Sequence, residues 1–227
     1  DYDLFIESDI NFFLDKLNAN DLKVTNKSWI EKCSRWKEIF AIENAFKSDE
    51  KIDLYDFSKS LSESMNDKSC FVCDSGLIDV IMPTTMQFKK GQRCLHPVSQ
   101  GAMGYALPAA VGASLSWEGE VVAVIGDGSI MMNLQELQTI VHHQLPIKIF
   151  IINNDAYSII RRRQEQLFRR RTIGTDDSNG VSCPDYEKVA AAFGIDYCLI
   201  DTPQKMKQDL SGILNTAGSF ICELVSK

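Results

Sequence analysis

The chain has 227 residues, a length that fits one large domain or one domain with an appendage. Hydrophobic residues make up 44% of it and charged residues 24%, close to the globular average, which excludes a disordered or fibrous chain. The formal net charge of -7 argues against nucleic acid as a partner, because proteins that bind it are normally basic. No apolar run reaches the roughly 18 residues that a membrane span needs, so we expect no membrane partner either.

The first 47 residues predict a short helical appendage without strands. Apolar residues recur at helical spacing over 9–17, where Ser8 or Asp9 can cap the helix, and again over 29–40. We interpret 1–47 as the tail of a preceding domain or as a linker. Because the chain does not begin with methionine, we expect it to be a piece of a longer protein.

Residues 48–227 predict an α/β domain in which strands and helices alternate. Helices are expected over 53–65, 101–115, 134–143, 186–193 and 203–215. Strands are expected over 70–73, 121–125, 147–152, 197–200 and 220–225. The central strands are continuous apolar runs, which is typical of parallel strands buried on both faces. We therefore expect a doubly wound, mostly parallel sheet with helices on both faces.

The most informative motif follows the apolar run 121–125, which ends in Gly126-Asp127-Gly128-Ser129 before a helix. Ligands of open α/β sheets bind at the carboxyl ends of strands, and a helix N-terminus offers N–H groups to a phosphate. Glycines let the backbone approach such a ligand closely. A carboxylate repels a phosphate, so Asp127 implies a cation between the two. Mg²⁺ prefers oxygen ligands and usually keeps substrate phosphates in its shell.

A second motif, Asn153-Asn154-Asp155-Ala156, follows the next strand, 147–152. An asparagine there supplies a neutral carbonyl oxygen to the same ion. We therefore expect Asp127, the Asn154 side chain and a nearby backbone carbonyl to be the protein ligands. A lone Gly-Asp-Gly favours a simple tight turn, whereas two such motifs at consecutive strand ends favour a site.

Together, the two motifs resemble the signature of thiamine diphosphate-dependent enzymes. The stretches 99–113 and 73–76 also look like those of acetolactate synthases and their 2-oxoacid decarboxylase relatives. The resemblance covers residue 68 to the C-terminus. It implies the thiamine diphosphate-binding fold, thiamine diphosphate and Mg²⁺ as cofactors, and transferase or carboxy-lyase activity on a small 2-oxoacid.

The resemblance also implies roles for individual residues. Asp127, Asn154 and the carbonyl of Ala156 bind Mg²⁺. The Gly101 carbonyl accepts from the aminopyrimidine, and Met103 supports the cofactor in a bent shape, so these two are the catalytic candidates. Without the resemblance, Met103 is better explained as core filling. The implied cofactor-binding residues are Ser75, Gly76, Gly101, Ala102, Met103, Gly126, Asp127, Gly128, Ser129, Asn154, Ala156 and Tyr157.

The sequence departs from the acetolactate synthase pattern at several positions. Leu77 and Ile78 replace a Gln and a His that help hold the diphosphate, and Ser158 and Ile159 replace Gly and Met. Arg163 replaces a tryptophan that helps choose the second 2-oxoacid. We therefore expect a more anionic or more polar acceptor than a plain 2-oxoacid, or a different reaction of the same enamine, unless Arg163 turns outward. The candidate substrate residues are Ile159, Arg163 and His96. Most arginines of 161–171 are expected to be solvated.

One part of the resembled enzymes has no counterpart here. In that family a glutamate on a separate pyrimidine-binding domain, commonly from a partner subunit, activates the cofactor. We therefore expect the chain to be inactive alone and to form the C-terminal part of a homodimer or homotetramer.

Two alternatives remain open. Seven scattered cysteines do not predict a disulfide framework and favour a reducing cytoplasm. Four of them superficially suit the iron–sulfur cluster of a 2-oxoacid:ferredoxin oxidoreductase β subunit, namely Cys70, Cys73, Cys94 and Cys198. The other alternative is a non-catalytic cofactor-binding or oligomerisation module that retains the fold.

Overall fold

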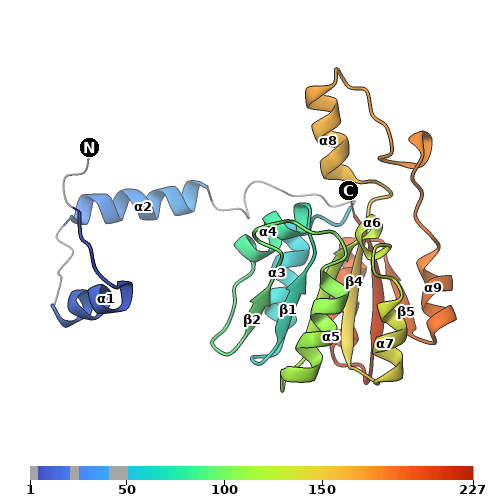
Figure 1. Cartoon of the computed structure of the whole chain (residues 1–227), viewed down its shortest axis with the longest axis horizontal. Coiled ribbons are helices and arrows are strands. Elements are labelled where there is room, and N and C mark those ends of the chain that lie inside the picture. The colour runs from blue at the N-terminus through green and yellow to red at the C-terminus, as the bar shows by residue number, and fades with distance from the viewer. Residues whose placement is uncertain (1–4, 21–25, 41–50, 227) are drawn as a thin grey trace. The chain divides into compact units, whose positions relative to one another are not determined.

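The computed structural model describes residues 5–20, 26–40 and 51–226 (Figure 1). The chain divides into two compact units, Asp1–Ala45 and Phe46–Lys227. The expected boundary between residues 47 and 48 lies outside the described residues. The interpretation of the first unit as the tail of a preceding domain stays a prediction.

The first unit contains two helices, α1 (Ile10–Ala19) and α2 (Lys27–Ile39). The Asp9 carboxylate caps α1 by accepting from two main-chain N–H groups, and the side-chain oxygen of Asn26 caps α2 by accepting from the N–H of Trp29. Neither helix has a buried residue. None of the helices in the described part of the chain is both long and apolar enough to cross a membrane.

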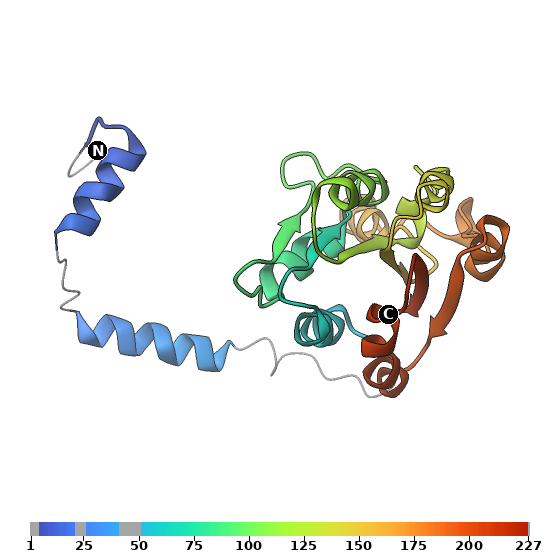
Figure 2. The same cartoon turned by 90° about the horizontal axis from the view of Figure 1, so that it is seen from below.

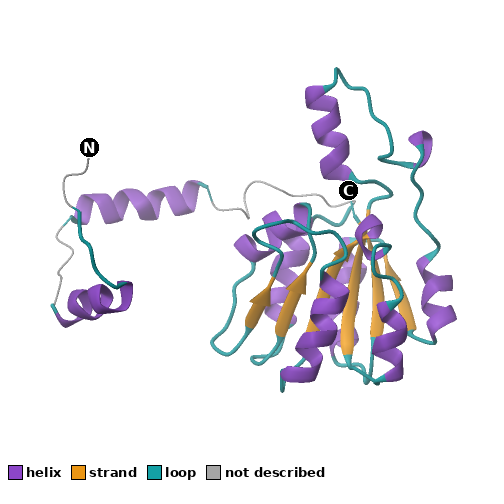
Figure 3. Ribbon diagram, in the orientation of Figure 1, coloured by secondary structure: helices purple, strands orange, loops and turns teal. Residues whose placement is uncertain are grey.

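The second unit is built on a six-stranded sheet with the strand order β2-β1-β3-β4-β6-β5. Every neighbouring pair is parallel, so all strands end at the same edge (Figure 3). The strands are β1 (Cys70–Cys73), β2 (Arg93–Leu95), β3 (Val121–Gly126), β4 (Ile147–Asn153), β5 (Asp196–Ile200) and β6 (Phe220–Val225). The predicted parallel sheet is confirmed.

Helices cover both faces of the sheet (Figure 2). One core contains side chains of α3 (Leu54–Ser64), α4 (Leu77–Thr85) and α10 (Pro203–Leu214). The other contains side chains of α5 (Ala106–Ser116), α7 (Glu136–His142) and α9 (Tyr186–Phe193). Because strand side chains alternate between faces, each central strand contributes to both cores. The doubly wound arrangement predicted from the apolar runs is therefore confirmed.

Three elements differ from the expected ones. Helix α5 begins at Ala106 rather than at residue 101, because Gly101 and Gly104 adopt positive φ angles of 57° and 80° that a helix cannot contain. Helix α4 was not predicted, since Pro83 in its last turn normally interrupts a helix. Strand β2 is only three residues long and forms an edge of the sheet, which leaves little periodic signal.

Candidate functional site

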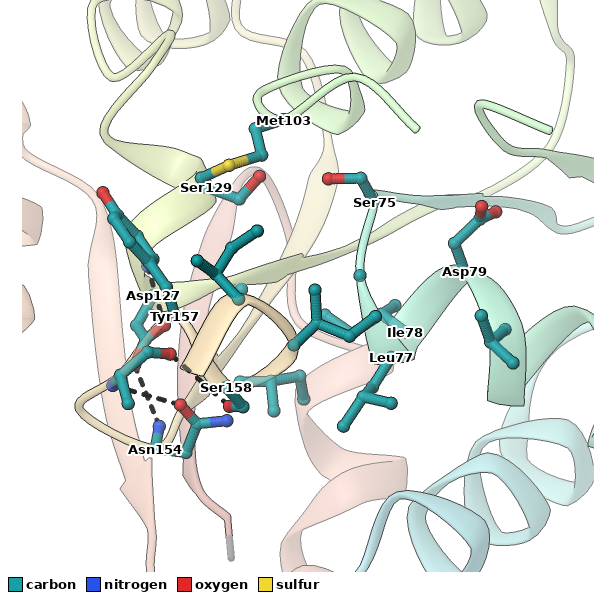
Figure 4. A pocket seen from close by; sticks show the side chains of 18 of the residues that line it. Ser75, Leu77, Ile78, Asp79, Met103, Asp127, Ser129, Asn154, Tyr157 and Ser158 are labelled. Carbon is teal, nitrogen blue, oxygen red and sulfur yellow. Dashed lines mark hydrogen bonds between the residues drawn. The ribbon is translucent and has the colours of Figure 1, made fainter. Parts of the chain in front are cut away.

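A cavity of about 410 Å³ lies where β1, β3 and β4 end (Figure 4). Its walls come from these strand ends, from the N-terminal part of α4, from the loop before α5 and from the start of α8 (Ser158–Leu167). The pocket therefore gathers segments that are far apart in the sequence. It lies at the carboxyl edge of the sheet, as the two motifs predict.

Asp127 and Asn154 meet at one wall of this pocket. The Asp127 carboxylate is buried and accepts from the N–H of Gly128 at 2.7 Å through Oδ1 and from the N–H of Asn154 at 3.0 Å through Oδ2. Asn154 Oδ1 in turn accepts from the N–H of Ala156 at 3.2 Å. Burial raises the pKa of Asp127, although these backbone donors oppose the shift. The ends of β3 and β4 thus bring Asp127, Asn154 and Ala156 together, while the Ala156 carbonyl accepts from the N–H of Ser158 at 2.9 Å.

The donor set fits a hard cation. A buried carboxylate, an amide oxygen and a backbone carbonyl are the oxygen ligands that Mg²⁺ accepts. No basic side chain of the described residues forms an ion pair with Asp127. The described part of the chain also holds no group of three or more His, Cys, Asp or Glu side chains suited to a metal. A cation bound to Asp127 would therefore need other oxygen ligands to complete its coordination shell, such as amide and main-chain carbonyl oxygens.

Gly128 makes room for Tyr157. A Cβ atom added to Gly128 would lie 1.7 Å from Cε1 of the Tyr157 ring, so only glycine fits there. Tyr157 is itself fixed by its N–H, which donates to the carbonyl of Thr175 at 2.8 Å. The glycine at position 128 was expected to let the backbone approach a ligand. In the structure it also lets the backbone approach the Tyr157 ring. Both residues line the pocket.

Asp74 was not among the residues predicted for the site, although it joins three of its segments. Its carboxylate is fully buried and accepts from the N–H groups of Gly104 at 3.1 Å and Ala106 at 2.7 Å. It also accepts a short hydrogen bond from the Ser129 hydroxyl. Asp74 therefore ties the end of β1 to the loop before α5 and to the turn after β3. The only available signal was its position between the apolar run 70–73 and Ser75-Gly76.

The loop before α5 forms another wall. Gly101 and Met103 line the pocket, whereas Ala102 is exposed and does not. Met103 is 39% exposed, which argues against a core-filling role. The loop is held by Gly104, whose carbonyl accepts from Asn133 Nδ2 at 2.8 Å. The structure therefore places both catalytic candidates at the pocket.

The wall formed by α4 is apolar apart from one carboxylate. Ser75 and Gly76 precede the helix, and Leu77, Ile78 and Asp79 follow along the pocket. Asp79 Oδ1 lies 2.7 Å from Nδ1 of His96. His96 does not line the pocket itself and reaches it only through this contact. No sequence pattern indicated Asp79 as its partner.

Helix α8 projects beyond the edge at which the strands of the sheet end (Figure 1). Ser158 and Ile159 line the pocket at its start. Arg163 is exposed and is not among the lining residues. Arg161 pairs with Asp176 at 3.2 Å and with Glu165 at 3.5 Å, which fixes one of the arginines at the base of the helix. The solvated arginines expected for this segment are thus exposed in the structure.

The geometry of the cysteines contradicts the iron–sulfur alternative. Cys70 and Cys73 belong to different cores because they point to opposite faces of the sheet. Cys94 lies on β2 at one edge, and Cys198 lies on β5 at the other edge. Thiolates placed in this way cannot surround one cluster. All seven cysteines are free.

A comparison with protein families decides the classification. Residues 74–224 match the thiamine pyrophosphate enzyme C-terminal TPP binding domain. The chain belongs to this family. Its fold, its two strand-end motifs and the position of its pocket agree with that assignment.

Curated relatives point the same way. The acetolactate synthase large subunit of Cyanidium caldarium is 29% identical to this chain over 98% of its length. The acetolactate synthase isozyme 2 large subunit of Escherichia coli is 38% identical over 53% of it. The chain spans only 38% and 22% of the length of these two relatives.

A solved structure shares the fold. The thiamine diphosphate-dependent 4-hydroxybenzoylformate decarboxylase of Rhodococcus jostii superposes with a TM-score of 0.71 at 23% sequence identity. The match covers 80% of this chain and 34% of the decarboxylase. The family's α/β fold is thus retained despite low identity.

Proposed function

We propose that the chain is the C-terminal, cofactor-binding part of a thiamine diphosphate- and Mg²⁺-dependent enzyme similar to acetolactate synthase. The enzyme decarboxylates a 2-oxoacid and either transfers the remaining unit to an acceptor or releases it as an aldehyde. The observation that carries the proposal is the wall formed by Asp127 and Asn154. A buried carboxylate without a cationic partner among the described residues lies there beside an amide oxygen.

Different residues of the pocket would bind different parts of the cofactor. Thiamine diphosphate, when bound, would supply a nucleophilic ylide carbon and a cationic thiazolium ring that accepts the electron pair left when carbon dioxide departs. Asp127, Asn154 and the Ala156 carbonyl bind Mg²⁺, and the Mg²⁺ holds the diphosphate. Gly126, Gly128 and Ser129 would contact the diphosphate on one side, and Ser75 and Gly76 on the other. Tyr157 also lines the pocket, whereas Ala102 does not and would contribute only through the main chain of its loop. Gly101 and Met103 orient the aminopyrimidine.

The remaining parts lie outside this chain. The acid that activates the cofactor comes from a pyrimidine-binding domain, so the active unit is a homodimer or homotetramer. We place this enzyme in the cytoplasm, since seven free cysteines suit a reducing compartment. Arg163 is exposed and does not line the pocket, so it would favour a more anionic or more polar acceptor only where that acceptor extends beyond the pocket wall.

The proposal is tested by carbon dioxide release from pyruvate and other 2-oxoacids by the intact enzyme. We expect release to require both thiamine diphosphate and Mg²⁺ and to stop when a chelator is added. The 227-residue chain alone serves as the control and should give no turnover. Release that is indifferent to the cofactor or to Mg²⁺ would overturn the proposal. Cofactor binding without release from any 2-oxoacid would favour the non-catalytic module instead.

A further inference from the structure

Glu223 on β6 is a buried carboxylate that the proposed function does not use. It is only 8% exposed, and no described basic side chain forms an ion pair with it. One of its oxygens accepts from Nδ2 of Asn153 at 2.6 Å, and the other accepts from the Tyr197 hydroxyl at 2.6 Å. Burial and this hydrogen bond raise the pKa of Tyr197, so its phenol stays a donor. Each of the two carboxylate oxygens of Glu223 therefore accepts a hydrogen bond from a protein donor.

Asn153, the last residue of β4, is oriented by this contact. Because its amide nitrogen faces Glu223, its Oδ1 turns the other way and accepts from the N–H of Asp155 at 3.0 Å. Its main-chain carbonyl accepts from the N–H of Ser226 at 2.8 Å. The side-chain amide thus has one possible orientation, and it links β6 to the turn that follows β4.

In that turn, Asp155 has an unfavourable backbone conformation and lies between the proposed ion ligands Asn154 and Ala156. Asp155 has a φ of 52°, in the left-handed region that side chains other than glycine seldom adopt. The reversal at Asp155 lets the N–H of Ala156 reach Asn154 Oδ1, while the N–H of Asn154 reaches Asp127. The hydrogen bond from Asp155 to Asn153 is the contact that holds this reversal in place.

We propose that Glu223 is a positioning residue that fixes the ion-binding turn through Asn153. The proposal rests on the function proposed above, because Asn154 and Ala156 matter only if they hold the ion. Glu223 touches neither ligand and acts by setting the orientation of the Asn153 amide. Partners of this outer kind typically change metal affinity by about 10–100-fold when they are removed.

The test compares three variants of the intact enzyme. Glu223→Ala removes the acceptor for Asn153. Glu223→Gln keeps an oxygen for Asn153 and turns its amide toward the Tyr197 hydroxyl, so it is the conservative rescue. Tyr197→Phe is the matched control, because it disturbs the same buried carboxylate from the side away from the turn. Two quantities are measured: amide hydrogen exchange over residues 153–157 without cofactor, and Mg²⁺-dependent thiamine diphosphate affinity by calorimetry.

We expect Glu223→Ala to speed exchange of the Asn154, Asp155 and Ala156 amides by about tenfold or more and to weaken Mg²⁺-dependent affinity by about 10–100-fold. Glu223→Gln and Tyr197→Phe should stay within about threefold of the wild type, and exchange within β4 should stay unchanged. If Glu223→Ala does not fold, Asn153→Ala tests the same link and should give the same two changes.

Unchanged exchange in the turn, or equal effects of Glu223→Ala and Tyr197→Phe, would overturn the proposal. Because exchange is measured without cofactor, it judges the positioning role separately from the proposed function. A wild type that binds no cofactor with Mg²⁺ would instead overturn the proposed function.

Discussion

The hydroxyl of Ser129 donates a short hydrogen bond to the carboxylate of Asp74, although 55 residues separate them in the sequence. The same carboxylate accepts from the N–H groups of Gly104 and Ala106. One buried side chain therefore joins the turn after β3, the end of β1 and the loop that carries Met103. The shape of the pocket depends on this junction as much as on the residues that line it.

Replacing Asp74 tests the junction directly. Asp74→Asn keeps the size of the side chain but turns an amide N–H₂ toward a main-chain N–H, which leaves a buried donor without an acceptor. We expect a loss of about 1–3 kcal/mol in the free energy of unfolding, measured by urea denaturation. Ser129→Ala removes one donor to Asp74 and one acceptor for the Gly104 N–H, which still reaches Asp74, so it should cost about 1 kcal/mol. Equal stability of Asp74→Asn and the wild type would contradict the role given to Asp74.

Gly126 and Gly128 form a matched pair for a test of packing. A Cβ at Gly128 meets the Tyr157 ring at 1.7 Å, whereas a Cβ at Gly126 has its nearest neighbours at 3.9 Å. We expect Gly128→Ala to lower the free energy of unfolding by about 1–3 kcal/mol, because the ring must move. Gly126→Ala should stay within about 0.5 kcal/mol of the wild type. If the added Tyr157→Ala substitution does not recover part of the loss, the clash is not its cause.

The thiol of Cys183 predicts a loss of stability at alkaline pH. Burial first, and the nearby Asp127 carboxylate second, raise the pKa of Cys183 from its ordinary value of 9.0 to about 11. The unfolded chain therefore releases this proton first, and the stability contributed by the neutral thiol is lost as pH rises from 9 through about 11. In Cys183→Ala the free energy of unfolding should decline less over this range. Parallel declines in urea titrations of the two proteins would contradict the shift.

The charge of Arg163 leads to a prediction about the charge of the acceptor. It is exposed on α8, beyond the residues that line the pocket, so it reaches only an acceptor that extends past Ile159. We expect Arg163→Trp to lower the preference for anionic over neutral acceptors by about tenfold, as loss of a charged hydrogen bond implies. Arg162→Trp, on the same exposed helix, is the control. Efficient acetolactate formation by the wild type, together with an unchanged preference in Arg163→Trp, would show that the idea is wrong.

The sequence predicted the sheet and the strand-end motifs because both depend on local patterns. Continuous apolar runs such as 147–152 identify buried parallel strands, and a glycine-flanked acid after a strand identifies a ligand site. Asp74 and Glu223 left no such pattern. Their roles come from partners more than 20 residues away along the chain, which only the folded arrangement brings together.

Local signals also misled in places. The alanine-rich stretch 101–115 predicts one helix, but the positive φ angles of Gly101 and Gly104 delay its start to Ala106 and form the loop that holds Met103. The spacing of Cys70 and Cys73 suited a shared cluster only superficially, and alternation along β1 indeed sends them to opposite faces. In both cases the backbone conformation, and not the residue types, decided the outcome.

The central claim is that Asp127 anchors Mg²⁺ and, through it, the cofactor diphosphate. The most direct test is isothermal calorimetry of thiamine diphosphate binding to Asp127→Ala in the intact enzyme, with and without Mg²⁺. Asp155→Asn is the control, since it changes a neighbouring exposed carboxylate and still tolerates a positive φ. The account predicts Mg²⁺-dependent binding in the wild type and in Asp155→Asn, and its loss in Asp127→Ala. Unchanged Mg²⁺-dependent affinity in Asp127→Ala would contradict it.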